Sequence, residues 1–377
     1  MIKIVADENI EFVKEAFSSF GKLTVLPGRE ISKDDLLDAD ILLVRSVTKV
    51  NESLLAGTKI KFVGTATIGS DHIDKTYLAA NNISFTDAAG CNSDAVKEYV
   101  FTALYQIAEE ENLKLKNKTI GIVGVGNIGG RVARVANAMG INVLKNDPPL
   151  KRKSNSNEYR ELDELMQADI ISIHVPLIKE GMDKTHHLFD EARLNKLKNG
   201  TILINSSRGS VVDNIALTKI ISEKKLSVIL DVWENEPNIN LDLLNKVKIA
   251  TPHIAGYSLE GKVNGTVILY KELCNYLNVS STWIPQLPAI NDKIIISDLE
   301  KQQSFQKVFS SIYDIRRDDS SIRKINELGD KERRSYFDSL RKNYALRREF
   351  TNYKIISDSD NKEIEGILNV LRFNVEK

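Results

Sequence analysis

The ten residues GIVGVGNIGG, at positions 121–130, decide the fold of this chain. They continue a short β-forming run and lead into RVARVANAMG, whose apolar residues recur on one face of a helix. Within the stretch, Gly124, Gly126 and Gly129 have the spacing of a dinucleotide-binding turn between a strand and a helix. Gly124 permits the tight turn, Gly126 lets the backbone approach a pyrophosphate, and Gly129 lets the helix pack on its strand.

Two further features favour a dinucleotide site over a purely structural turn. The first residues of the predicted helix, Asn127 and Ile128, offer backbone N–H groups and the positive end of the helix dipole to a phosphate. Asp147 ends the next predicted strand about 20 residues beyond the glycines, where a carboxylate accepts the ribose hydroxyls. This carboxylate would repel a 2′-phosphate, so we predict NAD rather than NADP. The cations at 151–153 argue against this prediction, because they could attract that phosphate.

Apolar runs alternate with amphipathic stretches on both sides of this turn. From residue 119 onward, six strands are predicted: TIGIVG, INVLKND, DIISIHVP, TILINSSRG, LSVILDVWE and VKIATPH. Before residue 90, five are predicted: IKIVAD, LTVL, DILLVRS, IKFVGTAT and ISFTD. This alternation predicts the α/β class, with two Rossmann-like, doubly wound parallel-sheet domains flanking a cleft.

Long helical patterns at 91–111 and 259–277 predict where the chain passes between domains. We expect a substrate-binding domain formed by 1–90 and 257–285, an NAD-binding Rossmann domain at 91–256 and a small C-terminal α/β dimerisation domain at 286–377.

The C-terminal part has a pattern of its own. We predict strands at DKIIIS and YKIIS, and helices at 299–313, 331–348 and 362–371. The first two helices are amphipathic, and a two-fold homodimer is the commonest way to bury such faces. The arginine pairs at 316–317 and 347–348 stand beside acidic residues, which is typical of a solvated or interface face.

Charge and cysteine content exclude several classes of protein. Lys+Arg and Asp+Glu both total 52, and this balance argues against a nucleic-acid or membrane-surface partner. Cys91 and Cys274 are far apart, so neither a disulfide framework nor a thiolate zinc site is expected. The N-terminal MIKIVADEN resembles a first strand rather than a signal peptide, and no apolar run has membrane-spanning length. We therefore expect a soluble, cytoplasmic protein.

Three candidate catalytic residues follow consecutive predicted strands. Arg208 follows ILINSS, Glu236 lies in DVWENEP, and His253 lies in TPHIAG. Because parallel strands end at one edge of a sheet, we expect these side chains to converge. A guanidinium binds a substrate carboxylate, an imidazole accepts a hydroxyl proton, and a carboxylate orients the imidazole. The set suits the oxidation of a 2-hydroxy acid.

The other histidines give no predicted metal site. His72, His174 and the pair at 186–187 lack the spacing that places two imidazoles on one helix face. His174 ends a predicted strand, and we expect it to form a wall beside the cofactor.

The motifs GVGNIG, INSSRG, DVWENEP and TPHIAG stand in the order found in one family. Over residues 1–277 the chain resembles the D-isomer-specific 2-hydroxyacid dehydrogenases. The resemblance implies NAD-dependent oxidation with Arg208, Glu236 and His253 as the catalytic set. It also implies substrate contacts at Ser46, Thr67 and Tyr257, and cofactor contacts at Asp147, Val175, Ser206, Ser207, Arg208, Asp231 and Gly256. Val175 replaces a threonine that is often found in this family, so a side-chain contact there is not expected.

Segments such as VRSVTKVNESLL, AGCNSDAVKEYVF and LRKNYALRRE resemble the family's vitamin B6-pathway member. This resemblance implies a homodimer that oxidises a phosphorylated four-carbon 2-hydroxy acid at C2. Arg45 and Lys49 are local candidates for the substrate phosphate, and Arg347 or Arg348 could add a further cation. Two alternatives stay open: a related dehydrogenase, such as one for 3-phosphoglycerate, and a dinucleotide sensor without turnover. A sensor would need none of the three catalytic residues.

Overall fold

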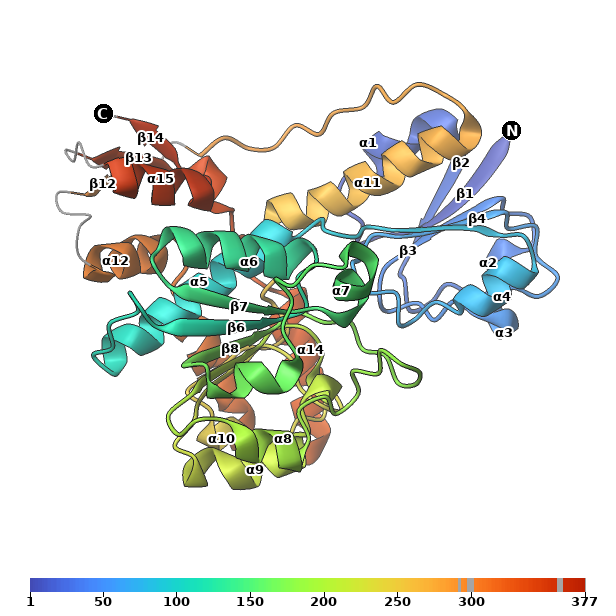
Figure 1. Cartoon of the computed structure of the whole chain (residues 1–377). Coiled ribbons are helices and arrows are strands. Elements are labelled where there is room, and N and C mark those ends of the chain that lie inside the picture. The colour runs from blue at the N-terminus through green and yellow to red at the C-terminus, as the bar shows by residue number, and fades with distance from the viewer. Residues whose placement is uncertain (291–292, 297–301, 358–361, 377) are drawn as a thin grey trace. The chain divides into compact units, whose positions relative to one another are not determined.

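The structure is a computed structural model that describes residues 1–290, 293–296, 302–357 and 362–376 (Figure 1). The chain divides into two compact units, Met1–Asn92 with Ser258–Pro288 and Ser93–Tyr257 with Ala289–Lys377. Each unit contains a parallel sheet with helices, so the predicted α/β class is confirmed. Within these residues, no helix is long and apolar enough to cross a membrane.

The first unit is built on a five-stranded parallel sheet in the order β2-β1-β3-β4-β5. Its strands are β1 Ile2–Asp7, β2 Gly21–Leu26, β3 Ile41–Val44, β4 Phe62–Thr65 and β5 Ser84–Asp87. Its helices are α1 Val13–Phe17, α2 Lys33–Leu36, α3 Glu52–Leu55, α4 Lys75–Ala80 and α11 Leu259–Leu277, with the 3-10 helix η1 Ser18–Phe20. Val44 pairs with Thr65 at the carboxyl ends of β3 and β4, so the loops after these strands begin side by side.

The second unit contains all six predicted Rossmann strands, in the order β11-β10-β9-β8-β6-β7. They are β6 Thr119–Val123, β7 Asn142–Asn146, β8 Ile170–Ile173, β9 Ile202–Asn205, β10 Ser227–Leu230 and β11 Ile249–Ala250. The strand order reverses between β6 and β8. Ligands of open α/β sheets bind at such a switch point, outside the carboxyl ends of the strands.

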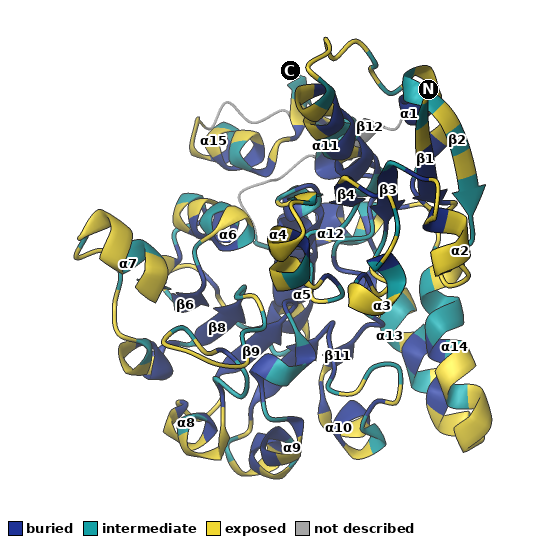
Figure 2. Ribbon diagram, turned by 90° about the vertical axis from the view of Figure 1, so that its right-hand side faces the viewer, coloured by how far each residue is buried: buried dark blue, intermediate teal, exposed yellow. Residues whose placement is uncertain are grey.

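Helices cover both faces of this sheet, which explains why its strands are continuous apolar runs. Along β9, Ile202 and Ile204 join one hydrophobic cluster, whereas Leu203 between them joins the other. α5 Ser93–Glu110 and α6 Asn127–Ala138 pack on the first face, and α8 Glu191–Lys196, α9 Asn214–Glu223 and α10 Leu241–Lys246 pack on the second (Figure 1). Figure 2 shows the buried strands β6, β8 and β9 between helices whose outer sides are exposed. The short elements are α7 Pro148–Ser154, η2 Leu162–Gln167 and η3 Gly209–Val211.

The C-terminal part of the second unit contains a three-stranded parallel sheet in the order β12-β13-β14. Its elements are β12 Lys293–Ile296, α12 Gln302–Ile312, α13 Ile315–Arg323, η4 Lys324–Glu327, α14 Asp330–Lys342, η5 Phe350–Asn352, β13 Lys354–Ser357, α15 Lys362–Leu371 and β14 Asn374–Glu376. Phe309 and Phe350 are buried in the cluster that contains α5 and α6, whereas Ile322 and Phe337 are buried in the other cluster. This part therefore completes both layers of the second unit.

Two predictions about the C-terminal helices were wrong. Helix α13 was not predicted, because its buried apolar residues are only Ile315 and Ile322, too few to give a periodic pattern. Helix α14 ends at Lys342 instead of continuing to 348. The start of the predicted helix 299–313 and the ends of the strand DKIIIS lie outside the described residues.

The solvated-face interpretation of the second arginine pair was also wrong. Arg347 and Arg348 follow α14 and are only 7% and 6% exposed. The Arg347 guanidinium carbon lies 4.6 Å from the Tyr313 ring centroid, and Nη2 donates to the Ala255 carbonyl. Burial is possible because the aromatic face and the carbonyl oxygen compensate the charge.

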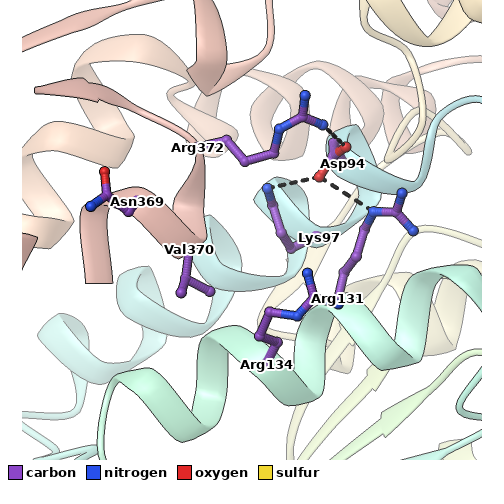
Figure 3. A pocket seen from close by; sticks show the side chains of 7 residues that line it. All are labelled: Asp94, Lys97, Arg131, Arg134, Asn369, Val370 and Arg372. Carbon is purple, nitrogen blue, oxygen red and sulfur yellow. Dashed lines mark hydrogen bonds and ion pairs between the residues drawn. The ribbon is translucent and has the colours of Figure 1, made fainter. Parts of the chain in front are cut away.

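A pocket of about 490 Å³ lies where α5, α6 and the C-terminal part meet (Figure 3). It is lined by Asp94, Lys97, Arg131, Arg134, Asn369, Val370 and Arg372. Asp94 Oδ1 lies 3.0 Å from Lys97 Nζ and 3.5 Å from Arg131 Nε, and Oδ2 accepts from Arg372. None of the predicted site residues lines this pocket. Its ion pairs tie the C-terminal part to α5.

Replacing Asp94 with asparagine is expected to lower the free energy of unfolding by about 1–2 kcal/mol at neutral pH, because it leaves the buried Lys97 ammonium without its nearest charge partner. Burial acts to raise the pKa of Asp94, but Lys97, Arg372 and Arg131 outweigh it, so the pKa is lowered. A lowered carboxyl pKa gives stability that is present above the unfolded pKa and is lost as pH falls through the folded pKa.

Urea unfolding of wild type and Asp94→Asn at neutral and acidic pH measures this effect. The difference between them should shrink as pH falls, whereas Glu223→Gln, at an exposed carboxylate of α9, should have little effect at any pH. Equal stability of wild type and Asp94→Asn at neutral pH would contradict the prediction.

Candidate active site

The glycine turn joins β6 to α6 at the switch point of the second sheet. Gly124 has φ +87°, which favours glycine, and a Cβ added at Gly129 would lie 1.9 Å from the Gly124 carbonyl oxygen. Both glycines are therefore required by the fold. A Cβ at Gly126 would meet nothing within 4 Å, so packing within the described chain does not require a glycine there. The predicted approach of a pyrophosphate to the backbone would account for that glycine.

Alanine substitutions separate these roles. Gly126→Ala is expected to weaken NAD binding by about 10-fold or more, because the added methyl group stands where the pyrophosphate approaches the backbone, with little change in thermal stability. Gly130→Ala is the matched control on the same helix, since its Cβ would meet only Val125 O at 3.6 Å. Titration of NAD by intrinsic fluorescence, with a melting curve of each variant, tests this. Equal affinity in the two variants would oppose a pyrophosphate site at Gly126.

His253 and Glu236 form a hydrogen-bonded pair in the second unit. His253 Nδ1 lies 2.8 Å from Glu236 Oε2, and Glu236 Oε1 accepts from the Trp233 N–H at 2.7 Å. The carboxylate therefore bridges the imidazole and the backbone of its own loop. His253 has φ +59°, a strained conformation for a residue with a side chain. The sequence correctly predicted that these residues come together.

Glu236 is held ionised by this arrangement. Burial acts to raise its pKa, but the charge and hydrogen bond of His253, the Trp233 N–H and the charge of Arg341 outweigh burial and lower it. A carboxylate that faces Nδ1 favours the tautomer with a proton on Nδ1, which leaves Nε2 as the acceptor.

Asp231 organises the loop that carries His253. Its Oδ1 accepts from the Ile254 N–H at 2.7 Å and from Thr251 Oγ1 at 2.6 Å, and its Oδ2 accepts from the Ala255 N–H at 3.0 Å. The side chain is 1% exposed. Its described contacts hold the His253 loop on β10, and the cofactor contact that the resemblance implies stays a prediction.

Arg208 lies in the loop after β9, directly before η3. Asn205 shapes this loop by donating to the Arg208 carbonyl at 3.0 Å and accepting from Ser207 N–H at 3.1 Å. Gly209 is needed for close approach, because an added Cβ would lie 2.0 Å from the carbonyl carbon of Trp233. The Arg208 loop therefore packs directly against the loop that carries Glu236. Ser206 and Ser207 are buried in the same turn.

His174 and Val175 follow β8 and border the glycine turn. A Cβ on Gly124 would lie 2.7 Å from His174 O and 2.8 Å from Val175 Cγ1. Burial lowers the pKa of His174 to about 3, and its Nε2 lies 2.8 Å from Ser172 Oγ. The imidazole is therefore neutral at physiological pH, and its position agrees with the predicted wall residue.

A second histidine cluster lies on neighbouring loops. His186, His187 and Glu234 have possible ligand atoms within 4.8 Å of one another. His187 Nε2 lies 2.7 Å from Glu234 Oε1, which explains the contact without a metal ion. The spacing in the sequence did not reveal this cluster. The absence of a metal site stays a prediction.

In the first unit, the predicted substrate contacts Ser46 and Thr67 each lie two residues beyond a strand end. Because β3 and β4 are neighbours, both residues occupy one edge of that sheet. Thr67 Oγ1 lies 2.8 Å from Thr65 Oγ1 and donates to the Gly69 carbonyl at 2.9 Å. Ser46 is exposed. The third predicted contact, Tyr257, lies in the second unit with its ring against Tyr344.

Comparison with known proteins identifies the family. Residues 92–255 match the D-isomer specific 2-hydroxyacid dehydrogenase, NAD binding domain, and residues 287–370 match a domain of unknown function. The chain is 45% identical to the erythronate-4-phosphate dehydrogenase of Proteus mirabilis, over 99% of both chains. It is 46% identical to the enzyme of that name from Enterobacter sp., over 99% of this chain and 98% of the relative. The chain belongs to the D-isomer specific 2-hydroxyacid dehydrogenase family.

Solved structures agree with this assignment. The D-lactate dehydrogenase of Aquifex aeolicus, complexed with NAD and lactic acid, is 28% identical with a TM-score of 0.60. That match covers 73% of this dehydrogenase and 95% of the solved chain. The 3-phosphoglycerate dehydrogenase of Entamoeba histolytica, with NAD bound, is 26% identical with a TM-score of 0.63, covering 74% and 95%.

The cofactor of this dehydrogenase is NAD. Asp147 lies beside the glycine turn, since its Oδ2 accepts from the Val125 N–H at 2.8 Å and its Oδ1 caps α7 through the Leu150 N–H at 2.9 Å. Each carboxylate oxygen has a second lone pair, so Asp147 keeps acceptors for the ribose hydroxyls that it is predicted to bind. Two of the neighbouring cations form ion pairs with other carboxylates, Lys151 with Glu161 at 2.6 Å and Arg152 with Asp183 at 2.6 Å. These two cations are therefore not directed at a 2′-phosphate.

Proposed function

We propose that this dehydrogenase oxidises the C2 hydroxyl of erythronate 4-phosphate, giving 2-oxo-3-hydroxy-4-phosphobutanoate in vitamin B6 biosynthesis. Its NAD-dependent action on a CH–OH group follows from the family. The observation that supports the reaction best is the His253–Glu236 pair, with Nδ1 and Oε2 2.8 Å apart. Relatives named erythronate-4-phosphate dehydrogenase that match nearly the full chain support the substrate.

His253 acts as the general base. With its Nδ1 proton directed to Glu236, Nε2 accepts the proton of the C2 hydroxyl as the C2–H bond breaks. NAD, when bound, accepts the hydride. The products are therefore the 2-oxo acid, NADH and one proton, which His253 releases to solvent. Glu236 stabilises the protonated imidazole that forms in this step.

Arg208 binds the substrate carboxylate, since a guanidinium fork matches two carboxylate oxygens. Ser46, Thr67 and Tyr257 contact the substrate, and Arg45 and Lys49, near the end of β3, are first-unit candidates for the phosphate. The backbone of the glycine turn and a group of further residues hold the cofactor. This group comprises Asn127, Ile128, Asp147, Val175, Ser206, Ser207, Arg208, Asp231 and Gly256.

Steady-state NAD reduction with three acids tests this proposal. Erythronate 4-phosphate should give the highest kcat/KM, by at least about 10²-fold over 3-phosphoglycerate and D-lactate, because an unfilled polar contact costs a site several kcal/mol. A preference for 3-phosphoglycerate would assign the related reaction. Tight NAD binding without turnover of any of the three acids would favour the dinucleotide sensor.

We also propose a cytoplasmic homodimer joined through residues 286–377. Leu346 is an exposed apolar residue of this part, so its substitution tests whether this surface is buried between two chains. Light scattering of the full chain should give twice the chain mass, and Leu346→Asp should lower it. A monomer in both cases would refute this proposal without affecting the assignment of the reaction.

A further inference from the structure

The C-terminal part fastens the loop that carries His253. Asp319 Oδ1 on α13 accepts from the Ala250 N–H at 2.8 Å, at the start of this loop. Arg347 donates to the Ala255 carbonyl in its middle. The Tyr344 ring meets Tyr257 edge to face, with 5.9 Å between the centroids, at its end. Figure 2 shows α13 beside β11, the strand from which the loop leaves.

Arg341, in the last turn of α14, belongs to the same contact. Its guanidinium carbon lies 5.8 Å from the Tyr257 ring centroid. Burial acts to lower the pKa of Arg341, but the Tyr257 hydroxyl, which shares a hydrogen bond with the guanidinium, and the charges of Glu236 and Asp231 outweigh burial and raise the pKa. The guanidinium therefore stays charged, and its charge helps to lower the pKa of Glu236. Arg341 lies outside the matched NAD-binding domain.

The positive charge of Arg341 is not neutralised by a direct ion pair within the described part of the chain. Glu236 already receives bonds from His253 and the Trp233 N–H, and Asp231 receives three from residues 251–255. Arg341 Nε is buried and has no hydrogen-bond partner among the described residues. A guanidinium has five N–H donors, and a buried donor without an acceptor is costly. The arrangement favours an anion beside Arg341.

We propose that Arg341 binds the phosphate group of the substrate, beside Tyr257. This inference rests on the proposed function and deepens it. The substrate carries two anionic groups at opposite ends of a four-carbon chain, and Arg208 takes the carboxylate. Arg341 comes from a different element and lies beside the predicted substrate contact Tyr257, so the proposal assigns it to the other end. A guanidinium fork matches phosphate oxygens as it matches a carboxylate.

The alternative is that Arg341 acts only through Glu236, by holding that carboxylate ionised. Such a positioning role would impair the oxidation of phosphorylated and unphosphorylated substrates equally, because both use the same base. A phosphate-binding role would change only the reaction of the phosphorylated acid. The comparison of erythronate 4-phosphate with erythronate separates these roles.

The experiment uses the full chain with Arg341→Met, Arg341→Lys and the control Arg334→Met, at an exposed arginine on the same helix. Arg341→Met should raise KM for erythronate 4-phosphate by about 10- to 100-fold, the worth of one charged hydrogen bond. The loss of kcat/KM should be at least about 10-fold larger for erythronate 4-phosphate than for erythronate, which carries no phosphate. Arg341→Lys should recover part of the loss, and Arg334→Met should behave as wild type. An equal loss with both substrates, or an unchanged KM, would overturn the proposal.

Binding of inorganic phosphate, measured by calorimetry on wild type and both Arg341 variants with NAD present, completes the test. Wild type should bind phosphate and Arg341→Met should not, with melting curves to confirm folding. If wild type fails to oxidise erythronate 4-phosphate but loses phosphate binding on Arg341→Met, the proposed function fails and the anion site stands. If Arg341→Met is unfolded, the test rests on Arg341→Lys. A site that requires the guanidinium would be refuted if Arg341→Lys bound phosphate as tightly as wild type and had the same KM.

Discussion

Replacing His253 with alanine is expected to lower kcat by about 10²–10⁴-fold, the usual contribution of a positioned general base. The imidazole is one-third exposed and paired with Glu236 at Nδ1, so Nε2 is the nitrogen available to the substrate hydroxyl. NAD affinity should change little, because the glycine turn lies on a different loop. Steady-state kinetics with erythronate 4-phosphate and an NAD titration measure the two effects separately.

His187→Ala provides the matched control. His187 is also about one-third exposed and also pairs with a carboxylate, since its Nε2 lies 2.7 Å from Glu234 Oε1. It lies outside the predicted catalytic set, so its kcat should stay within about 3-fold of wild type. A near-normal kcat in His253→Ala would contradict the assigned base, and an equal loss in both variants would point to a general disturbance of these loops.

Replacing Glu236 with glutamine is expected to lower kcat by about 10- to 100-fold, the worth of a charged hydrogen bond in a buried site. Because the pKa of Glu236 is lowered, the carboxylate stays ionised throughout the neutral range and favours a protonated imidazole. Without that charge the imidazole loses its proton more readily. At low pH, kcat/KM falls because His253 becomes protonated. This fall should therefore occur at lower pH in the variant than in wild type.

The pH profile decides whether Glu236 acts through its charge. Glu236→Asp keeps the charge and should retain an acid limb near the wild-type position, even if the shorter side chain lowers kcat. A Glu236→Gln profile that overlays the wild-type profile would mean that the carboxylate has only a structural role, as an acceptor for the Trp233 N–H.

Local signals made much of the fold predictable from the sequence. The glycine spacing around Gly124 predicts the turn, and the uninterrupted apolar runs predict strands that are covered on both faces. All six predicted strands are present in the sheet of the second unit. The pairing of Glu236 with His253 could be expected because parallel strands end at one edge of their sheet, and the catalytic roles of Arg208, Glu236 and His253 stay predictions. The direct packing of Gly209 against Trp233 explains why the first two loops stay together.

Contacts between distant segments were not predictable in the same way. Arg347 has the charge of a surface residue, and its burial depends on partners far away in the sequence, among them the Tyr313 ring and the Ala255 carbonyl. From the sequence, Arg347 and Arg348 were candidate site cations, whereas the structure brings Arg341 to Tyr257. The loop after α14 has no periodic pattern that could have placed the end of that helix at Lys342.

The most direct test of the central claim follows the hydrogen at C2. Erythronate 4-phosphate labelled with deuterium at C2 is incubated with the full chain and NAD, and the reduced cofactor and the acid product are analysed by mass spectrometry. We predict NADH that carries one deuterium and an equal amount of the 2-oxo acid, with little of either formed by His253→Ala over the same time. Unlabelled NADH, or no reduction of NAD by the wild-type chain, would contradict the proposed hydride transfer.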